Sequence, residues 1–441
     1  MKDFPVHQLE RLALLVALGA AVGAGLPGEA RAFALPAAIG AVVLGVGLAD
    51  YNPMRWQLWP AQATGLALFV LAIFDRDPSL WLTLAAVLLI TASAVLSAGF
   101  SVAPLPAPTG PFKVARRTLR LTHPAGAELE GREVEIEIWR PAAEDVSEHR
   151  RAPLWTRIYR DPVAPPLMRA LLSYCARVLT HAYDDAQPAP AAVKGCVLYH
   201  HGLVSVAVEN PLLLTELASR GYIVLAISPA GHAEEFRELN ADVPADAKAQ
   251  STALNKKLAG DLSREERARL SVELCAISPA TNEIVRRRAA DGALVLSRLG
   301  DLLGAAPGDL PVAAVGYSVG GAVAFELART HPRIAAAVNL DGGGFSADPA
   351  APLRTPALML YSAKNLGGND ALKAAAQAPF EEDVLPDTTH LDLHDAARVL
   401  PITKWLGASG RADARAVTTW RNGAVADFLD RQLGADDAAP R

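Results

Sequence analysis

The strongest constraint on this chain is the apolar character of its first hundred residues. Four long stretches there carry almost no charge, and each has about the length that crosses a hydrocarbon core as a helix. They cover residues 9–26, 32–49, 56–74 and 80–99. We therefore predict that residues 1–102 form a transmembrane domain of four helices, with the membrane bilayer as a partner.

Two other interpretations compete for this region. Lys2 and Arg11 precede the first apolar stretch, and Ala30-Arg31-Ala32 resembles the cleavage site of a signal peptide. Alternatively, the stretches could form a buried helical bundle of a soluble protein. Three further apolar stretches follow the first, and four such runs in so short a segment favour membrane helices over both alternatives.

The flanking charges give an orientation. With four spans, both flanks lie on one side of the membrane, and most of the basic residues near the spans, such as Arg55, Lys113 and Arg116, fall on that side. Because basic residues accumulate on the cytoplasmic side, we expect an integral, multi-pass membrane protein whose remaining part lies in the cytoplasm.

Charge and cysteine content narrow the remaining function classes. The formal net charge of −5 lacks the basic excess of a nucleic-acid-binding protein, so we expect no nucleic-acid partner. The three cysteines are odd in number, widely spaced and set among apolar residues, which predicts buried thiols and neither zinc ligands nor disulfides. The sequence does not give the oligomeric state.

A proline-rich linker at residues 103–111 separates the apolar region from the rest of the chain. After it, residues 117–121 and 133–139 alternate polar and apolar residues, which predicts a pair of antiparallel strands. Short apolar strands then alternate with helical segments. We therefore predict an α/β fold over residues 112–441, with a mostly parallel sheet covered by helices on both faces.

The segment 232–280 interrupts this alternation. It is highly charged and favours helix. It is either a solvated surface insertion or a lid, because insertions at the carboxyl edge of such sheets often border the ligand crevice. The sequence leaves both interpretations open.

The sharpest chemical signal is Gly316-Tyr317-Ser318-Val319-Gly320, which stands between a predicted strand and a predicted helix. This is the context in which a G-x-S-x-G motif places a nucleophilic serine on a sharp turn, with glycines that let strand and helix crowd together. We predict that Ser318 is a nucleophile and that Gly316 and Gly320 are the glycines of this turn. The preceding features then indicate an α/β-hydrolase.

A serine hydroxyl needs a base to take its proton and an acid to orient that base. In this fold they follow the serine in the order acid, then histidine. We favour His390 over His394 as the base, because it lies in a loop after a strand-like segment. For the acid we favour Asp341, at the end of the next predicted strand, and keep Asp370 as the alternative.

The reaction also requires N–H donors for the negatively charged oxygen of the tetrahedral intermediate. Val319, directly after the nucleophile, should supply one backbone N–H. Leu203, in the loop after the strand 195–199, should supply the other. His200 and His201 of this loop could be metal ligands, but no carboxylate or cysteine stands at a suitable spacing, so we expect no metal and no cofactor.

Together these residues resemble the plasma-type platelet-activating-factor acetylhydrolases and their bacterial relatives, from about residue 112 to the end of the chain. The resemblance rests on four segments: Tyr199–Leu203, Leu217–Val224, Gly316–Gly321 and Asn339–Asp341. In that family the acid follows the strand after the nucleophile helix, which corresponds to Asp341, and the histidine corresponds to His390. The resemblance implies metal-independent hydrolysis of short or oxidised acyl esters of phospholipids.

The sequence therefore predicts a membrane-anchored serine esterase, a carboxylic ester hydrolase whose expected substrate is an ester of a lipid with short or modified acyl chains. Two alternatives remain open. An acyltransferase would use the same residues with an alcohol in place of water. A membrane-bound binding module would keep the fold without the activity. Acyl chain length and head group are not determined by the sequence.

Overall fold

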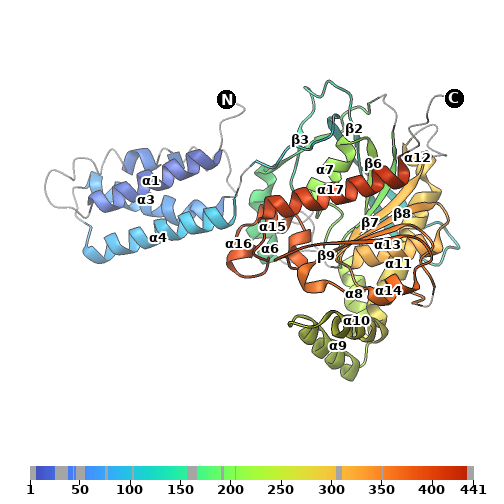
Figure 1. Ribbon diagram of the computed structural model, residues 1–441. Coiled ribbons are helices and arrows are strands. Elements are labelled where there is room, and N and C mark those ends of the chain that lie inside the picture. The colour runs from blue at the N-terminus through green and yellow to red at the C-terminus, as the bar shows by residue number, and fades with distance from the viewer. Residues whose placement is uncertain are drawn as a thin grey trace. The chain divides into compact units, whose positions relative to one another are not determined.

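The computed structural model describes most of the chain in several segments. The described residues are 6–24, 38–42, 44–45, 55–74, 78–101, 104–155, 166–189, 193–203, 205–303, 310–349 and 351–434. The chain divides into two compact units (Figure 1). The first comprises residues 1–105, 153–179 and 399–406, and the second comprises 106–152, 180–398 and 407–441. Residues 153–179 and 399–406 thus group with the apolar N-terminal region, although they follow the linker in sequence.

The first unit contains the apolar helices. They are α1 (Val6–Ala24), the short 3-10 helix η2 (Trp56–Leu58) with α3 (Trp59–Ile73), and α4 (Leu80–Gly99). The helix predicted over 32–49 lies mostly outside the described residues. Within the part of the chain that the structure describes, two helices are long and apolar enough to cross a membrane, Trp56–Ile73 and Leu80–Gly99, and a shorter apolar helix covers Arg11–Gly23.

These helices bury small side chains together with Leu68 and Ile90, and they expose several large apolar ones. α1, α3 and α4 pack against one another, and Ala21 and Ala86 are buried where they meet. Leu84 and Leu88 of α4 point outward, and Leu88 is 70% exposed. Small residues at the contacts let helix backbones approach closely.

The ends of α3 and α4 are tied to the later segments of the same unit, α6 (Pro166–Leu172), η3 (Ser173–Arg177) and α16 (Ile402–Trp405). Arg55 donates to the carbonyl of Phe100 at 2.6 Å and lies over the ring of Tyr174. Trp56 donates from Nε1 to the carbonyl of Leu171. The apolar helices and these later segments therefore share hydrogen bonds and ring contacts at one end of the bundle.

The second unit is built on a mixed sheet. Among the described residues the sheet has ten strands in the order β10-β9-β8-β7-β5-β6-β2-β1-β4-β3. Their bounds are β1 Val114–Thr122, β2 Glu133–Pro141, β3 Arg151–Pro153, β4 Leu179–Asp184, β5 Gly195–His200, β6 Tyr222–Pro229, β7 Val312–Tyr317, β8 Ile334–Leu340, β9 Ala357–Ser362 and β10 Phe380–Leu385. The strands from β10 to β6 are parallel, and β2 pairs antiparallel with both β6 and β1.

Helices cover both faces of the sheet (Figure 1). α7 (Pro211–Ser219) packs against α17 (Ala414–Leu433), and α11 (Pro279–Ser297) packs against α13 (Val319–Thr330). The remaining helical segments are α12 Leu299–Leu303, η4 Ala363–Asn365, α14 Asp370–Ala375, η5 His390–Leu393 and α15 Ala396–Val399. Every residue of β5, β6 and β7 is buried, as expected for parallel strands covered on both faces.

The predicted α/β class and the predicted antiparallel pair are confirmed by this arrangement. Residues 114–122 of β1 pair in register with residues 141–133 of β2. The pair extends the parallel part of the sheet through the contact between β2 and β6. The sheet is therefore parallel around β7, the strand that precedes Ser318, and antiparallel where β2 joins β6 and β1.

The charged insertion forms three helices, α8 (His232–Ala241), α9 (Ala245–Leu258) and α10 (Arg264–Ala276). Ser263 caps α10 in a reciprocal pair with Glu266. Ion pairs fasten the insertion to later parts of the unit, since Arg264 pairs with both Asp370 and Glu382.

Candidate active site

The candidate nucleophile stands on a strained turn between β7 and α13. Ser318 has φ 56° and ψ −126°, a conformation that costs free energy for a residue with a side chain. Its N–H donates to the carbonyl of Leu340 at 2.9 Å, and its own carbonyl accepts from Gly321. The neighbouring strand and the first turn of the helix thus hold Ser318 in this conformation.

Glycines at both flanks of Ser318 are required by close packing. A Cβ on Gly316 would lie 2.0 Å from the carbonyl oxygen of Gly320, and one on Gly320 would lie 2.0 Å from the carbonyl oxygen of His200. Any side chain there would displace the helix from the strand or from β5. The two glycines therefore allow the start of α13 to pack directly against β7 and β5.

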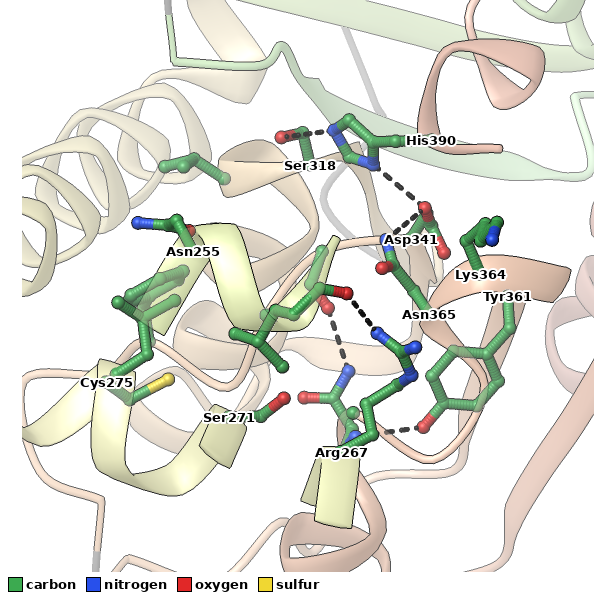
Figure 2. A pocket seen from close by; sticks show the side chains of 18 of the residues that line it. Asn255, Arg267, Ser271, Cys275, Ser318, Asp341, Tyr361, Lys364, Asn365 and His390 are labelled. Carbon is green, nitrogen blue, oxygen red and sulfur yellow. Dashed lines mark hydrogen bonds and ion pairs between the residues drawn. The ribbon is translucent and has the colours of Figure 1, made fainter. Parts of the chain in front are cut away.

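The structure brings Ser318, His390 and Asp341 together (Figure 2). Nε2 of His390 lies 3.0 Å from Oγ of Ser318, and Nδ1 of His390 lies 2.8 Å from Oδ2 of Asp341. The serine follows β7, the carboxylate follows β8, and the histidine begins η5 after β10. Three segments far apart in sequence thus form a continuous chain of hydrogen bonds from hydroxyl to carboxylate.

Asp341 is held by donors that the sequence analysis missed. Its carboxylate accepts from the N–H of Ser362 at 2.6 Å, from Oγ of Ser362 at 2.8 Å and from Nδ2 of Asn365 at 2.7 Å. Asp341 also has a positive φ of 58°. The carboxylate is therefore buried, fully hydrogen-bonded and aimed at Nδ1 of His390.

Tyr317, inside the G-x-S-x-G motif, contacts the imidazole of His390. The two rings stack with centroids 4.9 Å apart, and the hydroxyl of Tyr317 donates to the backbone carbonyl of His390 at 3.0 Å. One side chain thus fixes both the ring plane and the backbone of His390. No pattern in the sequence linked these two residues, because they meet only through the fold.

The surroundings of His390 shift its protonation. Burial lowers the pKa of its imidazole, but the hydrogen bond and charge of Asp341, with a contribution from Glu209, outweigh burial and raise it above the usual value. The doubly protonated ring is thus stabilised by the neighbouring carboxylate, which is what a base needs when it takes a proton from the serine.

The two alternatives of the sequence analysis lie elsewhere. Asp370 begins α14 and forms an ion pair with Arg264 at 2.7 Å. His394 is partly buried with its ring edge-on to that of Tyr317, its Nδ1 accepts from the N–H of Ala396, and desolvation lowers its pKa to about 3. Neither side chain takes part in the hydrogen-bond chain from Ser318 to Asp341.

The two predicted oxyanion donors lie in segments that adjoin the nucleophile. Val319 is the first residue of α13, so its N–H has no partner within the helix. Leu203 lies in the loop after β5, and this loop passes close to Ser318, because a Cβ on Gly202 would lie 3.5 Å from Cβ of Ser318. Gly202 donates its N–H to the carboxylate of Glu209, a buried residue that sequence reasoning missed.

Ser318, Val319 and His390 line a cavity of about 490 Å³ (Figure 2). The insertion supplies one wall through Leu258 and Leu274, and Phe345 and Met359 add further apolar surface. The charged insertion therefore borders the candidate site and is more than a solvated surface feature. The cavity combines an apolar lining with polar groups near the serine, as ligand pockets do.

The other reactive side chains near the site are held in inert forms. Cys275 also lines the cavity, and burial raises the pKa of its thiol to about 11, so it is protonated at neutral pH. His200 is buried, and burial lowers its pKa to about 3. Within the described residues, no three His, Cys, Asp or Glu side chains cluster as metal ligands would.

Comparison with known proteins shows the fold. No protein-family model matches the sequence, and no curated protein matches it either. Among solved structures, a ferulic acid esterase from Streptomyces cinnamoneus is similar, with 24% identity and a TM-score of 0.54. The match covers 77% of this chain and 97% of that one. The chain therefore contains the fold of that esterase almost in full, with additional residues of its own.

Proposed function

We propose that this chain is a serine hydrolase that cleaves carboxylic esters through Ser318, His390 and Asp341. The observation that carries the proposal is the position of His390, whose two ring nitrogens lie 3.0 Å from the serine hydroxyl and 2.8 Å from the aspartate. The strained turn at Ser318 and the fold shared with a ferulic acid esterase support it.

The proposed reaction passes through an acyl-enzyme. Nε2 of His390 takes the proton of Ser318 as Oγ attacks the ester carbonyl, and the N–H groups of Val319 and Leu203 stabilise the resulting oxyanion. The imidazolium, oriented by Asp341, then gives the proton to the leaving alkoxide. Water, deprotonated by the same histidine, releases the acid and restores the serine.

The cavity favours an ester of moderate size. Its volume of about 490 Å³ and its wall of leucine, phenylalanine and methionine side chains suit an apolar acyl or aryl group. The resemblance to the acetylhydrolases of platelet-activating factor points to short or oxidised acyl esters of lipids. The similar esterase, by its name, acts on ferulic acid esters, which makes aromatic esters the second class to test.

We also propose that the N-terminal helices anchor the enzyme in a bilayer, with the catalytic unit on the cytoplasmic side. The outward-facing side chains of α3 and α4 are large and apolar, including Leu66, Ile73 and Leu84. A surface of this kind is costly in water and favourable in lipid. The basic residues that flank the helices support the orientation.

The test is hydrolysis of p-nitrophenyl esters from acetyl to dodecanoyl, and of methyl ferulate, by the detergent-solubilised full chain. The expected result is turnover of short acyl esters and covalent labelling of Ser318 by a fluorophosphonate probe. Transfer of the acyl group to an added alcohol, with little free acid, would instead indicate an acyltransferase. A wild-type protein that neither turns over esters nor reacts with the probe would contradict the proposal.

A further inference from the structure

Two buried side chains, those of Arg288 and Glu209, form hydrogen bonds with the backbone of the loop after β5. Arg288 of α11, only 1% exposed, donates from Nη1 to the carbonyls of His201 at 3.0 Å and Gly202 at 3.2 Å, and from Nη2 to the carbonyl of Leu203 at 3.0 Å. On the other side, both carboxylate oxygens of Glu209 accept from the N–H of Gly202, at 3.0 and 3.1 Å. Neither charged side chain lines the catalytic cavity.

These contacts fix the first peptide plane of the loop at both ends. In a planar trans peptide the C=O and the following N–H point in opposite directions. The plane between His201 and Gly202 has its carbonyl on Arg288 and its N–H on Glu209. It cannot rotate without breaking the charge-assisted hydrogen bond to Arg288, which is of the stronger kind, and the hydrogen bonds to Glu209, whose pKa burial raises to about 7.

The peptide plane between Gly202 and Leu203 sets the direction of the N–H of Leu203, the proposed oxyanion donor. Its carbonyl, that of Gly202, also lies on Arg288, so the N–H of Leu203 points away from the guanidinium. If this plane turned over, a carbonyl oxygen would replace the N–H and would repel the developing negative charge. The orientation of the peptide between Gly202 and Leu203 therefore decides whether the oxyanion meets an N–H donor or a carbonyl oxygen.

We propose that Arg288, with Glu209 opposite it, is a positioning residue that holds the oxyanion loop so that the N–H of Leu203 faces the reacting carbonyl oxygen. The inference rests on the proposed esterase function. Neither side chain touches the reacting atoms; both act through the backbone of residues 201–203.

The chemistry of the guanidinium suits this task. Its planar fork presents several donors in fixed directions, whereas the ammonium of a lysine is a single point charge on a flexible stem. Burial lowers the pKa of Arg288 to about 10, while the charges of Asp291, Glu235 and Glu209 oppose that shift, so the side chain remains protonated at neutral pH. The buried guanidinium of Arg288 thus stays charged and donates hydrogen bonds to the carbonyls of three consecutive residues, 201–203.

The test compares Arg288→Lys, Arg288→Met, Glu209→Gln and Glu209→Leu in the detergent-solubilised full chain. The matched control is Arg329→Met, because Arg329 is also a buried arginine but pairs with Glu326 near the far end of α13. The measurements are kcat and KM for p-nitrophenyl butyrate, the melting temperature, and the inhibition constant of butylboronic acid. The boronic acid forms a tetrahedral adduct with the serine that depends on the oxyanion hole.

Removing one oxyanion donor typically lowers kcat by about 10²–10³-fold. We therefore expect Arg288→Lys to lower kcat by about 10- to 100-fold with KM nearly unchanged, and to weaken boronate binding by a similar factor. Glu209→Gln keeps an acceptor for Gly202 and should retain most of kcat, whereas Glu209→Leu should lose it. Arg329→Met should lower the melting temperature and leave kcat of the folded protein unchanged.

The inference would be overturned if folded Arg288→Lys kept wild-type kcat and boronate affinity, or if Arg329→Met lost kcat to the same degree. Should both Arg288 variants fail to fold, the Glu209 pair decides, since equal activity of the Gln and Leu variants contradicts the positioning role. Failure of the proposed function is distinct. In that case the wild type itself is inert to esters and to the fluorophosphonate probe, and the inference falls with it.

Discussion

The N-terminal helices and the sheet of the second unit differ in how many of their large apolar side chains they leave exposed. In the helices, Ala21, Ala86 and Ile90 are buried, whereas Leu88 is 70% exposed. In the sheet, Leu198 and Leu225 are completely buried at 0% exposure. The sheet therefore follows the rule for a protein folded in water, whereas the helices leave large apolar side chains exposed, as the proposed anchoring in lipid would require.

The difference indicates what stabilises each region. The sheet gains free energy when large apolar side chains leave water, at about 25 cal/mol for each Å² buried. The helices gain from close backbone approach at small residues and from burial of side chains such as Ile90, and they leave many other large side chains exposed. Chemistry and anchoring should accordingly be separable by mutation, and each of the following experiments tests that separation.

The largest expected effect is on catalysis alone. Ser318→Ala should reduce ester hydrolysis by roughly 10⁶-fold, because the nucleophile is removed and only the oxyanion donors and binding remain. Its membrane association should not change, since Ser318 lies in the catalytic unit. The measurement is the rate of p-nitrophenyl butyrate hydrolysis beside sedimentation with membranes. Residual activity near the wild-type level would assign the nucleophile to another residue.

A matched pair of aspartates sharpens the assignment of the acid. Asp341→Asn should reduce kcat by about 10⁴-fold, because an amide holds the imidazole in the wrong tautomer. Asp370→Asn should stay within about twofold, as Asp370 contacts Arg264 and lies away from His390. Steady-state kinetics of both variants decide the matter, and the reverse order of the two losses would move the acid to Asp370.

Charges on the outer face of α4 should affect anchoring alone. The double variant Leu84→Asp, Leu88→Asp should reduce retention in membranes after alkaline extraction, because each aspartate near a helix centre costs about 2.5–3.5 kcal/mol in lipid. Hydrolysis of a water-soluble ester should persist. The control is Val272→Asp, since Val272 is a comparably exposed apolar residue on α10 of the catalytic unit. If Val272→Asp lost membrane retention to the same degree, retention would not depend specifically on the outer face of α4.

Opposite changes of side-chain volume should destabilise the two interiors. Leu225→Ala should lower the free energy of unfolding by about 2–5 kcal/mol, because it leaves a cavity in the sheet. Ala21→Leu should cost about 1–3 kcal/mol through overpacking between helices. Thermal and denaturant unfolding of the solubilised chain measure both. An Ala21→Leu variant as stable as wild type would show that the helices do not pack closely at this position.

The smallest expected effect is a shift in the pH dependence of kcat/KM. His390 must be neutral to accept the serine proton, and Asp341 raises its pKa above the usual value near 6.5. The rate kcat/KM should therefore rise with pH and reach half its maximum above pH 6.5. In Asp341→Asn the raising interaction is gone and burial lowers the pKa, so the midpoint should move to lower pH. An unchanged midpoint in that variant would separate Asp341 from the titration of His390.

The sequence by itself determined the elements whose cause is local. The strand, the G-x-S-x-G turn and the helix at residues 312–330 are visible in the chain because strained turns of this kind require glycines at fixed spacing. The apolar stretches at residues 56–74 and 80–99 likewise follow from composition and length, and both are helical in the structure. The alternation of strands and helices was sufficient to predict the α/β class.

Only the tertiary structure decided which distant side chains meet. The sequence ranked Asp341 first but left Asp370 open, and the pairing of β8 between β7 and β9 places Asp341 against His390. The contacts of Arg288 with the backbone of residues 201–203 and of Tyr317 with His390 had no signal in the sequence. Such contacts depend on strand order and helix packing, which arise from the whole fold and leave no periodic pattern in any single segment.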